Sequence, residues 1–134
     1  MDEYPVERRC VGEPILAVRV LAMPKDTNAA GDIFGGWLMS QVDIAGSIAA
    51  WQAAGGRVVT VAVNSFRFLK PVLVGELVSC YAQVIRIGNT SVTVEVDTYA
   101  EPERDPDAVH KVAEATLTYV AIDEERNPRP ISEI

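Results

Sequence analysis

The sequence predicts an α+β fold in which a five-stranded antiparallel sheet wraps around one long central helix. Two observations support this prediction. The stretch from Gly35 to Ala54 has apolar residues at helical spacing and is followed by Gly55-Gly56, which is typical of a helix end. Five other apolar segments are typical of strands, and four of them follow the helix in succession, which favours an antiparallel sheet packed on it.

The first strand is expected from Ile15 to Ala22, which is rich in Val, Leu and Ile and is followed by Pro24. Residues 25–34 are dense in Asp, Asn and Gly and are expected to form a loop. Residues 101–110 form a charged loop, and Gly88-Asn89 is a plausible hairpin turn. The strands expected after the helix are Arg57–Phe68, with Val59, Val61 and Val63 on one face, then Leu77–Ile87, Ser91–Ala100 and Lys111–Ile122.

Apolar residues cover most of the circumference of the expected helix, which is typical of a buried helix rather than a half-exposed one. One narrow sector differs, because at about 100° per residue six small or polar residues fall on it. These residues are Gly36, Ser40, Asp43, Ser47, Ala50 and Ala54.

Length and composition indicate a single domain spanning residues 1–134, with residues 1–13 as a surface arm and residues 123–134 as a tail. A net charge of −7 argues against nucleic-acid binding. No apolar run approaches the roughly 20 residues of a membrane span, so we expect no membrane association and a cytoplasmic location. Cys10 and Cys80 have neither a C-x-x-C partner nor a nearby histidine, so no metal site and no disulfide framework is expected.

The start of the helix indicates acyl-transfer chemistry. Gly35 and Gly36 place bare backbone amides where N–H groups lack helical partners and the helix dipole favours negative charge. Asp43 follows two turns later on the same side, so a general base could lie near a bound oxyanion. Structural alternatives stay open: Asp43 could fix helix packing, the glycines could allow tight helix–sheet contact, and Asp32 could favour helix entry.

These residues resemble the hot-dog-fold acyl-CoA thioesterases, in particular their small bacterial YciA-like branch. The most specific match is the block GDIFGGWLMSQVD, from Gly31 to Asp43. The resemblance also rests on Leu21–Pro24, Asp26–Asn28, Gly56–Val61, Phe68–Pro71, Val74–Glu76, Thr90–Val92 and Tyr119–Ala121.

The resemblance implies a hot-dog fold, homodimers whose sheets join edge to edge, and often a trimer of dimers, which is a hexamer. It implies hydrolysis of acyl-CoA to a free acid and coenzyme A, with no cofactor other than the coenzyme A of the substrate. Asp43 would be the catalytic carboxylate in a site between subunits, and Asp32 takes a loop position that faces the carboxylate of the neighbouring subunit. Asn28, in the same matching loop, is counted with the catalytic candidates.

For this reaction we expect the Gly36 amide, with Gly35 as a second donor, to polarise the thioester carbonyl. Asp43 would either deprotonate a water or attack directly to give a mixed anhydride, and the sequence leaves both routes open. A thiolate leaves readily, so a dedicated general acid is less necessary. The phosphorylated end of coenzyme A requires cations, for which the candidates are Arg57, Arg67, Lys70 and Arg86. Thr90 and Ser91 are candidates for the border of the pantetheine channel.

Three other functions compete with hydrolysis. A hot-dog dehydratase would need a histidine at the site, and the helix stripe has none. A non-catalytic acyl-CoA sensor would not need Asp43. A purely structural oligomer would not explain a carboxylate beside a glycine pair.

Overall fold

The computed structural model describes residues 12–131. A first strand, β1 (Ile15–Leu21), is followed by a short 3-10 turn, η1 (Pro24–Asp26), and then by the single long helix, α2 (Gly35–Ala54). Four strands follow: β2 (Val58–Phe68), β3 (Leu77–Ile87), β4 (Ser91–Glu101) and β5 (His110–Ala121). Two further 3-10 turns, η2 (Pro102–Arg104) and η3 (Pro106–Ala108), form the β4–β5 connection.

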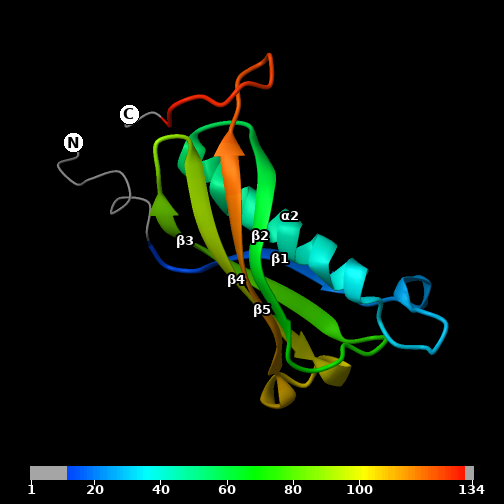
Figure 1. Cartoon of the computed structure of the whole chain (residues 1–134). Coiled ribbons are helices and arrows are strands. Elements are labelled where there is room, and N and C mark those ends of the chain that lie inside the picture. The colour runs from blue at the N-terminus through cyan, green and yellow to red at the C-terminus, as the bar shows by residue number, and fades with distance from the viewer. Residues whose placement is uncertain (1–11, 132–134) are drawn as a thin grey trace.

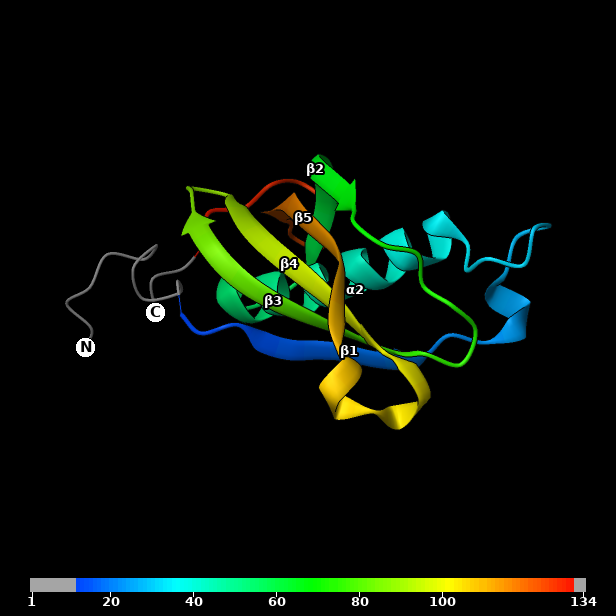
Figure 2. The same cartoon turned by 90° about the horizontal axis from the view of Figure 1, so that it is seen from below.

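The five strands form one antiparallel sheet in the order β1-β3-β4-β5-β2, and the sheet curves around α2 (Figures 1 and 2). This arrangement confirms the predicted fold, and the predicted strand and helix bounds differ from the observed ones by at most one residue. Because β1 and β2 lie at the two margins of the sheet, each has one side without a strand partner in the described chain.

The core lies between α2 and the face of the sheet turned toward it. Buried residues alternate along β3, β4 and β5, as expected for strands with one face on a core. The helix contributes small residues to this contact, so that it lies close to the sheet. Its buried residues are Leu38, Val42, Ala45, Gly46, Ala49, Ala50 and Ala54.

Two features of α2 and β2 differ from expectation. The helix is not buried all round, since Ile44 is 47% exposed and Trp51 is 53% exposed on the side that the sheet leaves uncovered. Val59 and Val63 do not share a face, because Val59 is paired with Val120 whereas Val63 is paired with the buried Leu117. The reason is a register irregularity between Thr60 and Ala62, which leaves Val61 as an extra residue.

The chain after β5 returns to the body of the molecule. Arg129 donates from a guanidinium nitrogen to the carbonyl of Ala54 at 3.1 Å, which satisfies an acceptor at the end of α2. Ile131 is buried in the core. Part of the expected tail is therefore packed rather than exposed. Of the expected surface arm, Gly12 and Glu13 are exposed, and Cys10 lies outside the described residues.

Candidate active site

The first turn of α2 presents the two glycines at the surface. Phe34 is the N-cap and supplies no side-chain hydrogen bond. Within residues 12–131, the amides of Gly35 and Gly36 have no hydrogen-bond acceptor, as expected at a helix start. A Cβ built on Gly35 would lie 3.6 Å from the ring of Phe68, and one on Gly36 would lie 3.7 Å from the ring of Phe34. These are ordinary contact distances, so packing within this chain does not explain the glycine pair.

The loop before the helix is organised by Asn28. Its side-chain oxygen accepts hydrogen bonds from the amides of Ala30 at 2.9 Å and Asp32 at 3.1 Å. Both Asn28 and Asp32 are exposed, and the loop projects beyond the N-terminal end of α2 (Figure 1). Asp32 lies two residues before Phe34, the N-cap of α2, and is not itself the cap residue.

Asp43, near the middle of α2, is turned toward the sheet. Its Oδ1 accepts a hydrogen bond from the hydroxyl of Thr60 at 2.7 Å and one from the hydroxyl of Tyr119 at 3.0 Å. The Tyr119 hydroxyl also lies 2.9 Å from the backbone carbonyl oxygen of Asp43. Thr60 and Tyr119 are direct partners in the β2–β5 register, and this is why both reach the same carboxylate.

Tyr119 is fully buried, and its burial raises the pKa of the phenol well above the ordinary value. The negative charge of Asp43 and the hydrogen bond to it raise the pKa further. The phenol therefore keeps its proton and remains a donor throughout the neutral pH range.

Two clefts adjoin the glycine pair. One, of about 270 Å³, is lined by apolar side chains together with Gly35 and Lys70. The other, of about 510 Å³, is lined by Gly36, Trp37, Phe34 and the residues Lys25, Asp26 and Thr27 of the preceding loop. Asp43 lines neither of these two clefts. Of the predicted cations, Lys70 lines one of these two clefts and the three arginines line neither.

The other predicted coenzyme A contacts lie elsewhere. Four of them lie at the opposite end of the sheet, where β2 begins and β3 turns into β4: Arg57, Arg86, Thr90 and Ser91. With about 3.3 Å per strand residue, this end lies roughly 30 Å from the Lys70 end. Arg67 points to the sheet face away from α2 and pairs with Glu114 at 2.9 Å. One chain therefore does not bring these residues together.

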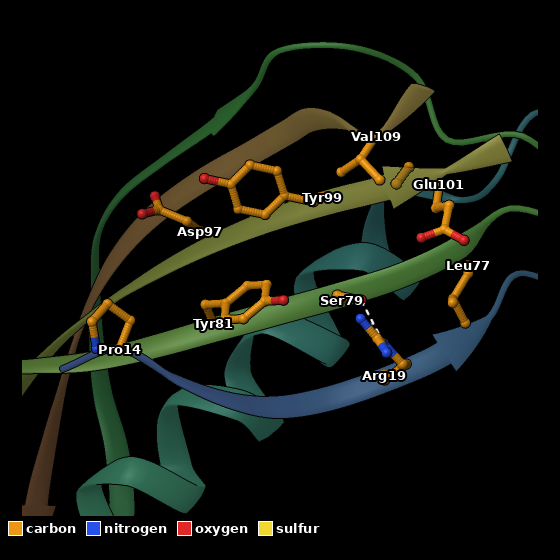
Figure 3. Close-up of a pocket in the computed structure, with 10 residues that line it drawn as sticks. Pro14, Arg19, Leu77, Ser79, Tyr81, Asp97, Tyr99, Glu101 and Val109 are labelled. Carbon is orange, nitrogen blue, oxygen red and sulfur yellow. Dashed lines mark hydrogen bonds between the residues drawn. The ribbon is translucent and has the colours of Figure 1, made fainter. Parts of the chain in front are cut away.

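The sheet face away from α2 carries a separate cavity of about 420 Å³ (Figure 3). Its walls include Tyr81 and Tyr99, whose rings form an edge-to-face pair, and Arg19, which donates to the hydroxyl of Ser79 at 2.9 Å. The strands separate this cavity from Asp43 and from the start of α2.

Among the described residues no group of three His, Cys, Asp or Glu side chains could hold a metal ion, and no helix is long and apolar enough to cross a membrane.

The comparisons with known proteins agree with this architecture. The family model described as the thioesterase superfamily matches residues 30–106, and the chain belongs to that family. The acyl-CoA thioester hydrolase YciA of Escherichia coli K12 is 50% identical over 118 residues, which cover 87% of this chain and 89% of the relative.

Solved structures show the same fold. The hexameric thioesterase y2039 from Yersinia pestis superposes with a TM-score of 0.86 at 47% identity, covering 92% of this chain and 100% of that chain. An acyl-CoA hydrolase from Staphylococcus aureus, in complex with butyryl coenzyme A and coenzyme A, superposes with a TM-score of 0.78 at 32% identity. That match covers 85% of this chain and 69% of the other. The predicted hot-dog fold, the YciA-like resemblance and the enzyme class, a thioester hydrolase, are confirmed.

Sequence reasoning did not single out Thr60 and Tyr119. Both lie in stretches that carry the family resemblance, Gly56–Val61 and Tyr119–Ala121, so a signal was present. Their shared contact with Asp43 depends on a strand pairing between residues 59 positions apart in the chain, since 119 − 60 = 59.

Proposed function

We propose that the protein hydrolyses acyl-CoA to a free carboxylic acid and coenzyme A. The amide of Gly36, assisted by that of Gly35, would donate hydrogen bonds to the developing oxyanion, and Asp43 would activate a water or attack the thioester carbon. The observation that carries this proposal is the held carboxylate of Asp43 in a thioesterase-family chain whose helix opens with two accessible glycine amides.

The chemistry of each group fits this role. A carbonyl oxygen within about 3 Å of a helix N-terminal amide gains both a donor and the favourable end of the helix dipole. The absence of a side chain at positions 35 and 36 leaves room for that approach. The leaving thiolate has a conjugate acid with a pKa of about 8.5, so it departs without a strong general acid.

We further propose that each site uses two subunits. Gly36 and Asp43 of one chain are seven residues apart, which is about 10 Å along a helix axis, because 7 × 1.5 Å = 10.5 Å. Attack on a carbonyl requires a separation of about 3 to 3.5 Å between nucleophile and carbon. Asp43 of the same chain is therefore too far from a carbonyl bound at Gly36, and we propose that Asp43 of another subunit acts on it. The separation of Asp43 from the two clefts beside the glycines supports this arrangement.

The free edge of β2 is the surface that would join the two subunits. This strand is 11 residues long, and it exposes 54% of Val61 and 47% of Val63. A long apolar edge strand without a partner is a natural site for strand pairing. Edge-to-edge pairing through β2 gives a homodimer, and three such dimers would give a hexamer, which is the state named for the Yersinia pestis thioesterase.

A shared site also accounts for the two separated groups of predicted coenzyme A contacts. Lys70 lies by the glycine amides, whereas Arg57, Arg86, Thr90 and Ser91 lie at the far end of the sheet. One extended ligand could meet both groups if the second group came from a neighbouring subunit. We propose no metal or separate cofactor for this reaction.

The direct test is release of free thiol from acyl-CoAs of graded chain length by the wild type and by Asp43→Asn. A general base contributes about a hundred-fold or more, so turnover of the variant should fall by at least that factor. Asp97→Asn, on the opposite face of the sheet, is the matched control and should hydrolyse normally. Full turnover by Asp43→Asn, or binding of acyl-CoA by the wild type with no thiol release, would contradict the proposal.

A further inference from the structure

A glycine in the middle of α2 has a role that the proposed reaction does not assign. Gly46 faces the sheet, and a Cβ built on it would collide with the hydroxyl of Tyr119 and lie 3.0 Å from the ring carbon Cζ. Gly46 is buried, and glycine weakens a helix interior by roughly 1 kcal/mol relative to alanine. The space at position 46 thus serves to admit the Tyr119 hydroxyl.

The admitted hydroxyl contacts Asp43 at two atoms. It lies 2.9 Å from the backbone carbonyl oxygen and 3.0 Å from the carboxylate Oδ1 of that one residue. The contact with the main chain holds the hydroxyl beside Asp43, and rotation of the carboxylate about χ1 would break the contact with Oδ1, so the hydroxyl favours the observed rotamer. The ring is locked in turn, because Tyr119 is fully buried in the sheet core.

The two hydroxyl donors act on one carboxylate oxygen. Thr60 and Tyr119 both donate to Oδ1, and in residues 12–131 no donor is hydrogen-bonded to Oδ2. The two oxygens of Asp43 therefore differ: Oδ1 is hydrogen-bonded by two hydroxyl groups, and Oδ2 is bonded by none of the described residues.

We propose that Tyr119, admitted by Gly46, is a positioning residue that fixes Asp43 so that Oδ2 is its reacting oxygen. The inference rests on the proposed function, because it assigns a role through Asp43. It predicts that the hydroxyl of Tyr119 affects the chemical step and not the affinity for acyl-CoA.

The experiment compares Tyr119→Phe with Tyr99→Phe, a hydroxyl removal on the outer face of the sheet. Loss of a hydrogen bond to a charged group that acts in the chemical step should lower the rate by about ten- to a hundred-fold. The kcat of Tyr119→Phe should therefore fall by that factor, while KM stays within about two-fold of the wild-type value. Tyr99→Phe should keep both parameters. Wild-type kcat per folded subunit in Tyr119→Phe, with folding followed by circular dichroism, would overturn the inference.

Gly46→Ala probes the same contact from the helix and does not depend on the folding of Tyr119→Phe. The added methyl should displace the hydroxyl and lower kcat. In the double variant Gly46→Ala/Tyr119→Phe the two losses should not add, because both remove one interaction. Fully multiplied losses would overturn the inference.

A background of Asp43→Asn separates this inference from the proposed function. There, Tyr119→Phe should cause no further loss of the residual rate. If Asp43→Asn itself retains full activity, the proposed function fails. If Asp43→Asn is inactive but Tyr119→Phe turns over like the wild type, the positioning role alone fails.

Discussion

Packing within its own chain does not explain why residue 36 is a glycine. A methyl group at this position would make only an ordinary contact with the ring of Phe34. The same methyl group would stand beside the amide that we propose as the oxyanion donor. Stability and activity should therefore respond in opposite directions when the glycine is replaced.

Gly36→Ala tests this separation. We expect turnover to fall by at least about ten-fold, since removing an oxyanion contact typically costs a hundred-fold or more and the methyl only obstructs it. The melting temperature should stay the same or rise, because alanine favours helices over glycine. Gln52→Ala, an exposed position in the last turn of α2, is the matched control and should keep full turnover. Unchanged thiol release by Gly36→Ala would show that the substrate does not approach this amide.

Single residues also show where sequence reasoning stops. Asp43 and the glycine pair were predicted because helical spacing and a distinctive local block place them together along the chain. Thr60 and Tyr119 could not be paired from spacing, since their meeting depends on the register of β2 against β5. The role of Gly46 could not be predicted from spacing either, because only the packed structure shows that the Tyr119 hydroxyl fills the space beside it.

The strands and the helix were predicted closely, since apolar periodicity and glycine or proline boundaries set them locally. The register of β2 against β5 was not predicted. Irregularities between Thr60 and Ala62 and between Val63 and Ser65 each add a residue, and strict alternation fails between them. The two irregularities together leave Thr60 and Phe66 on the face that meets α2, opposite Tyr119 and Ala115.

The outer face of the sheet carries a chain of ion pairs across β2, β5 and β4. Arg67 pairs with Glu114 at 2.9 Å, and Lys111 lies 2.8 Å from Glu114 and 3.1 Å from Asp97. The hydrogen bond from Lys111 lowers the pKa of Glu114, and the two carboxylates raise the pKa of Lys111. Because Arg67 forms its ion pair with Glu114 on this outer face, it does not line the clefts at Gly35 and Gly36.

Glu114→Gln should lower the melting temperature by only a few degrees, because exposed pairs contribute little. Since the folded-state pKa of Glu114 is depressed, its contribution is present above the unfolded pKa and is lost as the pH falls. The difference in melting temperature between wild type and variant should be fully present above the ordinary glutamate pKa of about 4.3 and should disappear as the pH falls through the lower folded-state pKa of Glu114. Glu95→Gln, on the same face, is the control. A difference that persists at low pH would show that the charge of Glu114 is not its cause.

At the scale of the whole molecule, the residues of the proposed site lie apart from one another within one chain. The amide donors and Lys70 lie at one end of α2, the candidate contacts for the far part of coenzyme A lie at the other, and Asp43 lies between. The unpaired β2 edge and the exposed side of α2 at Ile44 and Trp51 supply surfaces on which further copies could pack. The central claim is that the amides of one subunit act with Asp43 of another.

Mixed oligomers test that claim most directly. Asp43→Ala and Gly36→Ala subunits, each expected to have a tenth of the wild-type activity or less alone, are combined in equal amounts, dissociated and allowed to reassociate. Half of the random dimers would be mixed, and each would hold one intact site of two, so thiol release should recover to about a quarter of the wild-type value. Each variant carried alone through the same cycle is the control. A mixture no more active than the separate variants would contradict the shared site.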